Sequence, residues 1–361
     1  MHMPEPVRVL IVAASLDILG GQAVQAQRLI EHLNNEPSVE VSFLPINPRL
    51  PGVLRKLQSI KYVRTVTTSI LYCLNLLRQV RKHDVVHIFS ASNLSFLIAP
   101  TPAILIGRLY GKKILLNYHS GQAEAHLRRW RRSTIPILNL VDEVVVPSGF
   151  LVEVFSKFGI ETSAIFNDID LKRFEFRERV PLRPLFLSNR NLEALYGVDC
   201  ILRAFALIQQ QVPEAVLRVV GYGSQREALE SLKSELNLRN ISFTGRIDHE
   251  DIYQHYSASD IFLNASRTDN QPLSIIEAFA CGLPVVTTDA GGIPYMVTDG
   301  ETGFVVRVDD HEALANRALD LLTRQDTAME MVQRAHAECV KYTWEVVGPQ
   351  WVSLYHSLTQ K

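Results

Sequence analysis

Short apolar runs that alternate with segments of helical spacing constrain the fold of this 361-residue chain more than any other feature. Runs such as RVLIVAA and PVVTT are apolar on both faces, as strands are when helices cover each side of a sheet. The alternation predicts parallel strand–helix–strand units rather than a sandwich or a helical bundle. Strands are expected at Val7–Ala14, Val39–Leu44, Asp84–Ser90, Lys112–Tyr118, Glu143–Pro147, Ser163–Phe166, Pro184–Ser188, Val216–Val220, Ile241–Phe243, Asp260–Asn264, Pro284–Thr288 and Gly303–Arg307.

The chain length and the two series of strands predict two domains, because a typical domain has roughly 100–200 residues. We expect an α/β domain over residues 1–172 and a second over residues 180–343. Between them, Asp170–Pro184 is charged, weakly periodic and ends in prolines, which predicts a linker. Residues 344–361 carry apolar side chains at helical spacing, which predicts a terminal helix.

The composition excludes several classes of protein. With 47% hydrophobic and 21% charged residues, the chain is typical of a globular protein rather than a disordered one. Its four cysteines form no CxxC pair, so neither a zinc site nor a disulfide framework is expected. The N-terminus lacks a signal-peptide pattern and no transmembrane helix is expected, so we predict a cytoplasmic protein.

Basic residues are concentrated in the first half of the chain. No acidic residue occurs between Glu40 and Asp84, although eight Lys and Arg residues lie at positions 49–82. A second cluster, Arg128–Arg132, surrounds Trp130. Such segments suit the anionic surface of a membrane or an anionic acceptor, and a solvated basic face is the alternative.

Open α/β sheets bind ligands beyond the carboxyl ends of their strands, so ligand-binding and catalytic residues are expected in the loops at those ends. Gly20 and Gly21 follow the first strand and precede a helix expected at Gln22–Asn34, where backbone amides could approach a phosphate or a sugar. A tight turn without ligand is the alternative, and the absence of GxGxxG disfavours a dinucleotide site. His119 closes another strand and could bind a sugar hydroxyl or assist an acceptor, or it could be a core histidine.

In the second half, Arg190 follows the strand LFLS, and the glycines Gly221 and Gly223 follow the strand LRVV. A cation and backbone amides at such a place suit the leaving nucleoside diphosphate of a glycosyl transfer, which gains negative charge as its bond breaks. The alternative for Arg190 is a surface ion pair.

The densest cluster of polar and special residues is the segment Asp269–Gly282. Its two carboxylates stand eight residues apart: Asp269 on a loop could bind sugar hydroxyls, and Glu277, expected in the first turn of a short helix, could grip a ribose diol. A capping box of Ser274 and Glu277 is the alternative for the second carboxylate. Gly282 is expected to end that helix. The remaining candidate residues of this segment are Asn270, Gln271, Pro272, Leu273 and Ser274.

Taken in order along the chain, these landmarks resemble the family-4, GT-B-type glycosyltransferases of group 1, and the resemblance covers nearly the whole chain. It is carried by the early double glycine, His119, VPSGF, IFNDIDLKRF, Arg190, GYGSQ, FTGRI, the acidic pair spaced E-x7-E, GLPVVTTDAGGIP and DGETGF. The resemblance implies an α/β fold of two Rossmann-like doubly wound parallel-sheet domains facing across a cleft, with the C-terminal helix packing back on the first domain.

The same resemblance implies a retaining enzyme whose donor lies on the second domain and whose acceptor lies mainly on the first. No metal or other cofactor is expected, so Asp168-Ile-Asp170 is not interpreted as a metal-binding motif. Glu277 would hold the ribose and Asp269 the donor sugar, while Arg190 and the amides near Gly20, Gly21 and Gly223 would face the pyrophosphate. His119 would lie near the reacting sugar.

Two positions depart from the family pattern. Asp269 stands where glutamate is usual, and Tyr196 stands where the family has a lysine six residues after the arginine. Tyrosine brings no charge, so part of the leaving-group stabilisation is missing. We hypothesise that Arg246, Arg226 or Arg267 compensates for it.

The predicted function is therefore transfer of a sugar from a nucleotide-diphosphate sugar to a glycan or lipid-linked glycan acceptor in cell-surface polysaccharide biosynthesis. Peripheral contact with the inner face of an anionic membrane is also predicted, and no nucleic acid is expected as a partner. The alternatives are a catalytically silent sugar-nucleotide-binding protein and a sugar-nucleotide epimerase of the same fold. The nucleotide base, the sugar, the acceptor and the oligomeric state are not predicted.

Overall fold

A computed structural model describes residues 5–15, 21–49, 60–90, 92–248 and 251–360 of the chain. The chain folds into two compact units, called here the first and the second unit. The first unit comprises Met1–Asp168 and Trp344–Lys361, and the second comprises Ile169–Thr343. The chain thus passes into the second unit at residue 169, close to the expected end of the first domain at residue 172.

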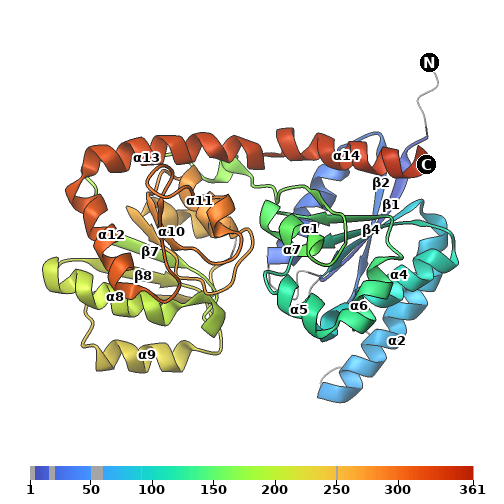
Figure 1. Ribbon diagram of the computed structural model, residues 1–361, viewed down its shortest axis with the longest axis horizontal. Coiled ribbons are helices and arrows are strands. Elements are labelled where there is room, and N and C mark those ends of the chain that lie inside the picture. Colours follow the sequence, from blue (N-terminus) through green and yellow to red (C-terminus); the bar gives the residue numbers. More distant parts are fainter. Residues whose placement is uncertain (1–4, 16–20, 50–59, 91, 249–250, 361) are drawn as a thin grey trace. The chain divides into compact units, whose positions relative to one another are not determined.

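The first unit is built on a six-stranded, fully parallel sheet in the order β2-β1-β3-β4-β5-β6 (Figure 1). The registers are regular, for example Val9 of β1 beside Val41 of β2. The strands are β1 (Val7–Ala13), β2 (Val39–Pro45), β3 (Val85–Ser90), β4 (Lys113–Tyr118), β5 (Glu143–Val146) and β6 (Ser163–Ala164).

Each face of this sheet has its own hydrophobic core, because side chains alternate between the two faces along a strand. In β1, Val9 and Ile11 belong to the core under α1 and α14, while Leu10 and Val12 belong to the core under α2, α4 and α7. Figure 1 shows α14 along one side of the sheet. The helices are α1 (Gly21–Leu33), α2 (Lys61–Gln79), α3 (Leu94–Ile98), α4 (Pro100–Leu109), α5 (Ala123–Arg129), α6 (Arg131–Leu138), α7 (Gly149–Ser156) and α14 (Trp344–Gln360).

The second unit repeats this architecture with a parallel sheet in the order β12-β11-β10-β7-β8-β9. The order reverses direction between β7 and β10, which are neighbours, so this pair marks the switch point at which such sheets bind ligands. The strands are β7 (Leu185–Asn189), β8 (Val216–Val220), β9 (Ile241–Gly245), β10 (Ile261–Leu263), β11 (Val285–Thr288) and β12 (Phe304–Val306).

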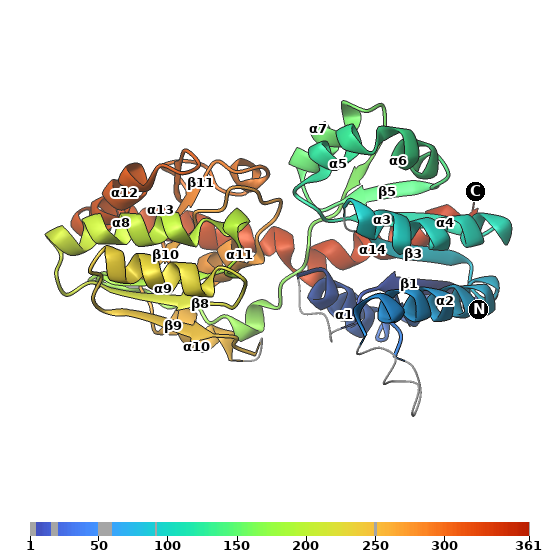
Figure 2. The same ribbon diagram turned by 90° about the horizontal axis from the view of Figure 1, so that it is seen from below.

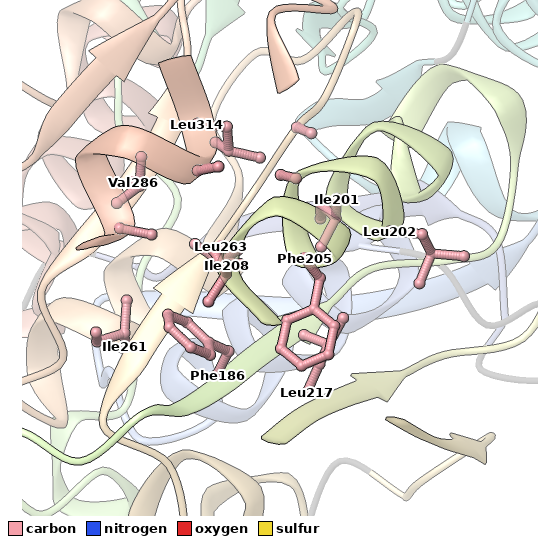
Figure 3. Packing of buried hydrophobic residues seen from close by; sticks show 14 of the residues in the cluster. Phe186, Ile201, Leu202, Phe205, Ile208, Leu217, Ile261, Leu263, Val286 and Leu314 are labelled. Carbon is pink, nitrogen blue, oxygen red and sulfur yellow. The ribbon is translucent and has the colours of Figure 1, made fainter. Parts of the chain in front are cut away.

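Helices cover both faces of the second sheet. Figure 2 shows α8 and α9 side by side over β8 and β9. In the core, the rings of Phe186 in β7 and Phe205 in α8 meet edge to face with centroids 6.1 Å apart, beside Leu217 of β8 (Figure 3). The helices are α8 (Val198–Gln211), α9 (Arg226–Glu235), α10 (Ile252–Ser257), α11 (Leu273–Ala280), α12 (His311–Thr323) and α13 (Gln325–Glu338).

The predicted fold class is confirmed: each expected strand is present, with bounds that shift by no more than two residues. The segment Asp170–Pro184, predicted as a linker, is instead packed into the second unit. Three arginines of this segment converge on the buried carboxylate of Asp260: Arg177, Arg179 and Arg183. None of the described helices is both long and apolar enough to cross a membrane.

Candidate active site

The candidate residues of the second unit meet at the carboxyl edge of its sheet, around the switch point. Arg190 comes directly after β7, and Tyr196 ends a short 3-10 turn, Ala194–Tyr196, in the following loop. Asp269 lies after β10, and Glu277 lies in α11. These residues are brought together because parallel strands end at one edge of the sheet.

Arg190 is the centre of this cluster. One terminal nitrogen of its guanidinium forms an ion pair with Asp269 Oδ2, and the other lies 3.3 Å from Ser274 Oγ. The guanidinium carbon lies 4.2 Å from the centre of the Tyr196 ring, a cation–π contact. The side chains of Arg190 and Asp269 are only 11% and 13% exposed. The Arg190 Nε atom is buried and has no hydrogen-bond partner among the described residues.

The Asp269 carboxylate is held from several directions. Its Oδ1 accepts a hydrogen bond of 3.0 Å from the Asn270 amide, and its Oδ2 lies 3.1 Å from the Ser266 hydroxyl. The Asp269 carbonyl accepts from the Gly292 amide at 3.2 Å. A Cβ atom on Gly292 would lie 2.1 Å from the Asn270 carbonyl oxygen, so this glycine allows close backbone packing against the loop. Asp269 is therefore fixed as one half of an ion pair.

Glu277 is buried and is held by Tyr256 of α10. The Tyr256 hydroxyl donates to Glu277 Oε2 at 2.7 Å and itself accepts from Asn189 Nδ2 at 3.0 Å. Burial, and next the Glu277 carboxylate, raise the pKa of Tyr256 well above its usual range, so the phenol stays protonated and remains a donor. One carboxylate oxygen of Glu277 is thus fixed in orientation by a buried phenol.

Two local predictions about α11 are corrected. The helix begins at Leu273 after the extended Pro272, so Glu277 lies beyond the first turn. Ser274 lies inside the helix instead of at its N-cap, so the alternative capping box does not form. The predicted end is confirmed: Gly282 has φ +73°, and the amides of Gly282 and Leu283 bond back to Phe279 and Ala278, as in a Schellman motif.

The glycines after β8 have a packing role that the sequence analysis did not assign. The Gly221 amide donates to the Gly245 carbonyl at 3.0 Å, so this amide is already used within the fold. A Cβ atom on Gly221 would lie 2.0 Å from the Arg190 carbonyl oxygen, and one on Gly223 would lie 2.4 Å from that of Leu192. The two glycines therefore let the β8 loop press against the loop that carries Arg190 and Tyr196.

The three arginines considered as substitutes for a lysine differ in their partners. Arg267 binds the carboxylates of Asp199 and Asp309, both at 2.7 Å. Arg226 pairs with Glu230 one turn along α9 at 2.7 Å. Arg246, directly after β9, is exposed and faces the Tyr222 ring at 6.0 Å, and no ion pair to a described carboxylate holds it.

His119 and Gly21 belong to the first unit. His119 follows β4, and its ring stacks on Phe89 with centroids 5.3 Å apart. Burial lowers the pKa of His119 to about 4, so the ring is neutral at pH 7, and its buried Nε2 has no partner among the described residues. Gly21 is the exposed first residue of α1, one residue before the predicted start, and Gly20 lies outside the described residues.

The aspartates of the DID motif have roles in the fold. Asp168 is buried, and its Oδ2 lies 3.4 Å from His32 Nε2. The Asp170 side chain caps a 3-10 turn by accepting from the Lys172 amide at 3.1 Å. No cluster of three or more His, Cys, Asp or Glu side chains suited to a metal ion occurs in the described part of the chain.

Sequence reasoning missed Asn189 and Tyr256. Asn189 is the last residue of β7, so the rule that led to Arg190 could also have found it. Tyr256 looks like an ordinary apolar position of a short helix, with Ile252 one turn before it, and nothing in the sequence indicates its bond to Glu277.

Comparison with known proteins shows that the second unit is similar to a family of enzymes. A model of the family "Glycosyl transferases group 1" matches residues 172–338, nearly the whole of that unit. A GDP-mannose-dependent alpha-(1-6)-phosphatidylinositol monomannoside mannosyltransferase of Mycolicibacterium smegmatis is 32% identical over 208 residues, which cover 54% of this chain and 54% of that protein. The chain therefore spans about half the length of this relative.

Two further likenesses extend over more of the chain. A phosphatidyl-myo-inositol mannosyltransferase of Propionibacterium freudenreichii is 27% identical over 284 residues, covering 75% of this chain and 70% of that protein. The crystal structure of Anabaena HepE in complex with UDP-glucose superposes with a TM-score of 0.76 at 17% identity, covering 97% of this chain and 99% of that one. The fold is accordingly GT-B. Over residues 172–338, this chain is similar to the glycosyl transferases group 1 family.

Proposed function

We propose that the chain is a glycosyltransferase that moves a sugar from a nucleotide-diphosphate sugar to a glycan or glycolipid acceptor. The observation that carries this proposal is the cluster of Arg190, Asp269 and Glu277 at the switch point of the second sheet, inside the segment that the family model matches. A largely buried cation and two fixed carboxylates are suited to a ligand that has both a pyrophosphate and vicinal hydroxyl groups.

In this proposal each member of the cluster has one task. Glu277, oriented by Tyr256, accepts hydrogen bonds from the ribose hydroxyls. Asp269 faces the transferred sugar, and its ion pair with Arg190 keeps a cation close to the bond that breaks. Retention of anomeric configuration and independence from metal ions are part of the proposal on the strength of the family resemblance. Turnover unchanged by a chelator such as EDTA would support the second point.

We further propose that Arg246 supplies the charge that Tyr196 lacks. Arg267 and Arg226 are engaged with carboxylates, whereas Arg246 stands exposed at the carboxyl edge of β9, two strands from β7. Two strand spacings are about 10 Å, a distance that a long arginine side chain can shorten when an anion is bound. The Tyr222 ring beneath Arg246 would guide its guanidinium across that interval.

A rescue experiment tests this assignment. Arg246→Ala should lower donor turnover by about 100-fold, the effect of removing one stabilising donor from a leaving group. Arg239→Ala is the matched control, because this exposed arginine precedes β9 and so lies at the opposite edge of the sheet. Adding Tyr196→Lys to Arg246→Ala should restore part of the activity. Equal turnover of the wild type and Arg246→Ala would reject the role of Arg246.

The names of the similar proteins suggest candidates for the acceptor and for the nucleotide base. The Mycolicibacterium protein is named for GDP-mannose and a phosphatidylinositol mannoside, and the HepE structure contains UDP-glucose. We propose a lipid-linked or polysaccharide acceptor in cell-surface biosynthesis, with peripheral contact to a membrane. Thermal shift with UDP, GDP and their sugars identifies the donor, because a ligand that binds the folded state raises the melting temperature.

A catalytically silent binding protein is the second candidate, and the Tyr196 substitution favours it. A silent protein is stabilised by the nucleotide sugar but releases no nucleoside diphosphate, with or without acceptor. Release measured by a coupled assay therefore separates the two functions. If no donor that raises the melting temperature yields nucleoside diphosphate, the chain is a binding protein and the transferase function is rejected.

A further inference from the structure

The outer face of α2 carries a stripe of apolar side chains that the fold leaves exposed. Val66, Ile70, Leu74 and Leu77 are 58%, 57%, 46% and 37% exposed. Their spacing of four, four and three residues places them on one side of the helix, within an arc of about 80°. This set of four residues is called the α2 stripe below.

The opposite face of α2 anchors it firmly to the first unit. Tyr72 and Leu76 are almost completely buried, and the Tyr72 hydroxyl donates to the Ala99 carbonyl at 2.8 Å. The helix is thus a fixed element of the fold, and the α2 stripe faces away from the core. The neighbouring α4 likewise exposes Leu105 and Leu109, one turn apart, at 47% and 73%. Several exposed large apolar residues on two helices in contact indicate an interaction surface.

The charged residues of α2 and of the turn that follows it are all positive. No acidic residue occurs between Glu40 and Asp84, and Arg64, Arg78, Arg81 and Lys82 are all exposed. None of these four cations forms an ion pair with a described carboxylate. At about 100° per residue, Arg78 lies about 40° beyond Leu74 around the helix axis, and Arg64 lies about 40° beyond Arg78 in the same direction.

This combination selects one kind of partner. A second copy of the chain would bring an identical basic face against the first in a two-fold contact, and the like charges would repel. A nucleic acid would satisfy the cations but would leave the apolar stripe without a partner. An anionic lipid bilayer satisfies both, because phosphate groups meet the cations while the apolar side chains enter the boundary of the acyl chains.

We propose that α2 lies in the surface of an anionic membrane, with Val66, Ile70, Leu74 and Leu77 inserted and Arg64, Arg78, Arg81 and Lys82 on the headgroups. The inference goes beyond the basic charge read from the sequence, because it assigns part of the affinity to apolar insertion. It rests on the proposed function only in that a membrane-borne acceptor gives the surface its use.

The test measures co-sedimentation with vesicles of 30% phosphatidylglycerol in phosphatidylcholine and with vesicles of phosphatidylcholine alone. The full chain should bind the anionic vesicles at least about tenfold better at low salt. Ile70→Ser/Leu74→Ser should lower that binding about tenfold at both low and high salt, because it removes insertion. Arg78→Gln/Arg81→Gln should lower binding mainly at low salt, because charge attraction is screened by salt.

The matched control is Val180→Ser/Val340→Ser, which removes two apolar side chains of the second unit that are 71% and 59% exposed. It should bind vesicles like the wild type. The proposal is overturned if Ile70→Ser/Leu74→Ser binds as well as the control, or if the wild type treats both kinds of vesicle alike. Conversion of a dimer into a monomer by Ile70→Ser/Leu74→Ser, without vesicle binding by the wild type, would assign the stripe to self-association instead. Thermal shift by nucleotide sugars, measured without vesicles, reports separately on the proposed function.

Discussion

The guanidinium carbon of Arg190 lies 4.2 Å from the centre of the Tyr196 ring, while the guanidinium is paired with Asp269. Tyr196, which stands where the glycosyltransferases that this chain resembles usually have a lysine, therefore contacts the arginine through its ring. A lysine at this place would bring a second positive charge, whereas tyrosine packs on the first one. The cluster thus has one cation, which Asp269, Ser274 and Tyr196 position.

Removing the Tyr196 ring should misplace Arg190. Tyr196→Ala is expected to lower donor turnover by about 3- to 10-fold, equivalent to about 1 kcal/mol of a partly buried cation–π contact. Tyr196→Phe keeps the ring and should stay within about twofold of the wild type. Steady-state kinetics check both variants. A loss in Tyr196→Phe as large as in Tyr196→Ala would show that the hydroxyl, not the ring, is required.

Asp269→Asn should both inactivate and destabilise the protein. The change leaves the Arg190 charge almost buried without its counter-ion, which should cost about 2 kcal/mol of stability and about 100-fold in turnover. Asp309→Asn is the control, since it breaks the ion pair of an arginine in the same unit where the aspartate side chain is 54% exposed. That change should cost less than about 1 kcal/mol and leave turnover unaltered. Chemical denaturation and activity assays of the pair decide the point.

Tyr256→Phe should weaken binding of the nucleoside diphosphate without changing its chemistry. The variant removes the hydrogen bond to Glu277, so affinity should fall about tenfold, while kcat at saturating donor stays within about twofold. Discrimination between ribo- and dideoxyribonucleoside diphosphates should shrink, because Glu277 is assigned to the ribose. Tyr253→Phe, at a 42% exposed position of the same helix, is the calorimetric control. A change of kcat alone would place Tyr256 outside this role.

Gly221→Ala should lower the free energy of unfolding of the second unit. Its added Cβ would lie 2.0 Å from the Arg190 carbonyl oxygen, and φ is +140°, so a loss of about 3 kcal/mol is expected. Gly245→Ala has an unfavourable φ of +75° but no atom within 4 Å, and should cost only about 1 kcal/mol. The difference between the two, measured by circular dichroism during urea denaturation, gives the cost of the close approach. Similar losses would mean that φ alone matters.

The first unit should lose stability in mild acid because of its buried histidines. His87 lies beside the Tyr355 hydroxyl at 2.8 Å, and burial, with His119 as a second cause, lowers its pKa to about 3. The unfolded chain, with a His pKa near 6.5, takes up protons below that pH, whereas folded His87 does not. The free energy of unfolding is therefore highest above pH 6.5 and should fall by about 2 kcal/mol for this ring between pH 6.5 and pH 5.

His87→Gln should reduce that pH dependence, and His356→Gln, at a partly exposed position of α14, should not. All three tryptophans, Trp130, Trp344 and Trp351, belong to the first unit, so their fluorescence reports its unfolding alone. An unfolding midpoint of His87→Gln with the same dependence on pH as the wild type would remove His87 as the cause.

The sequence by itself determined the fold class and the strand positions. Runs such as RVLIVAA are apolar on both faces because helices cover both sides of the sheet. This pattern can be recognised from the local sequence without knowledge of the partners. It also determined that Arg190, Asp269 and Glu277 belong to one edge, since all of them follow strands or start from loops at carboxyl ends.

Only the tertiary structure decided what these residues touch. The contact of Arg190 with Asp269 joins positions 79 residues apart, and that of Tyr256 with Glu277 joins a position the sequence left unmarked. The charged segment before β7 looked like a linker because its partner, the buried Asp260, lies about 80 residues away, directly before β10. Local patterns indicate which face of an element is apolar. Contacts between residues far apart in the sequence depend instead on the order of the strands in the sheet, which places β10 beside β7.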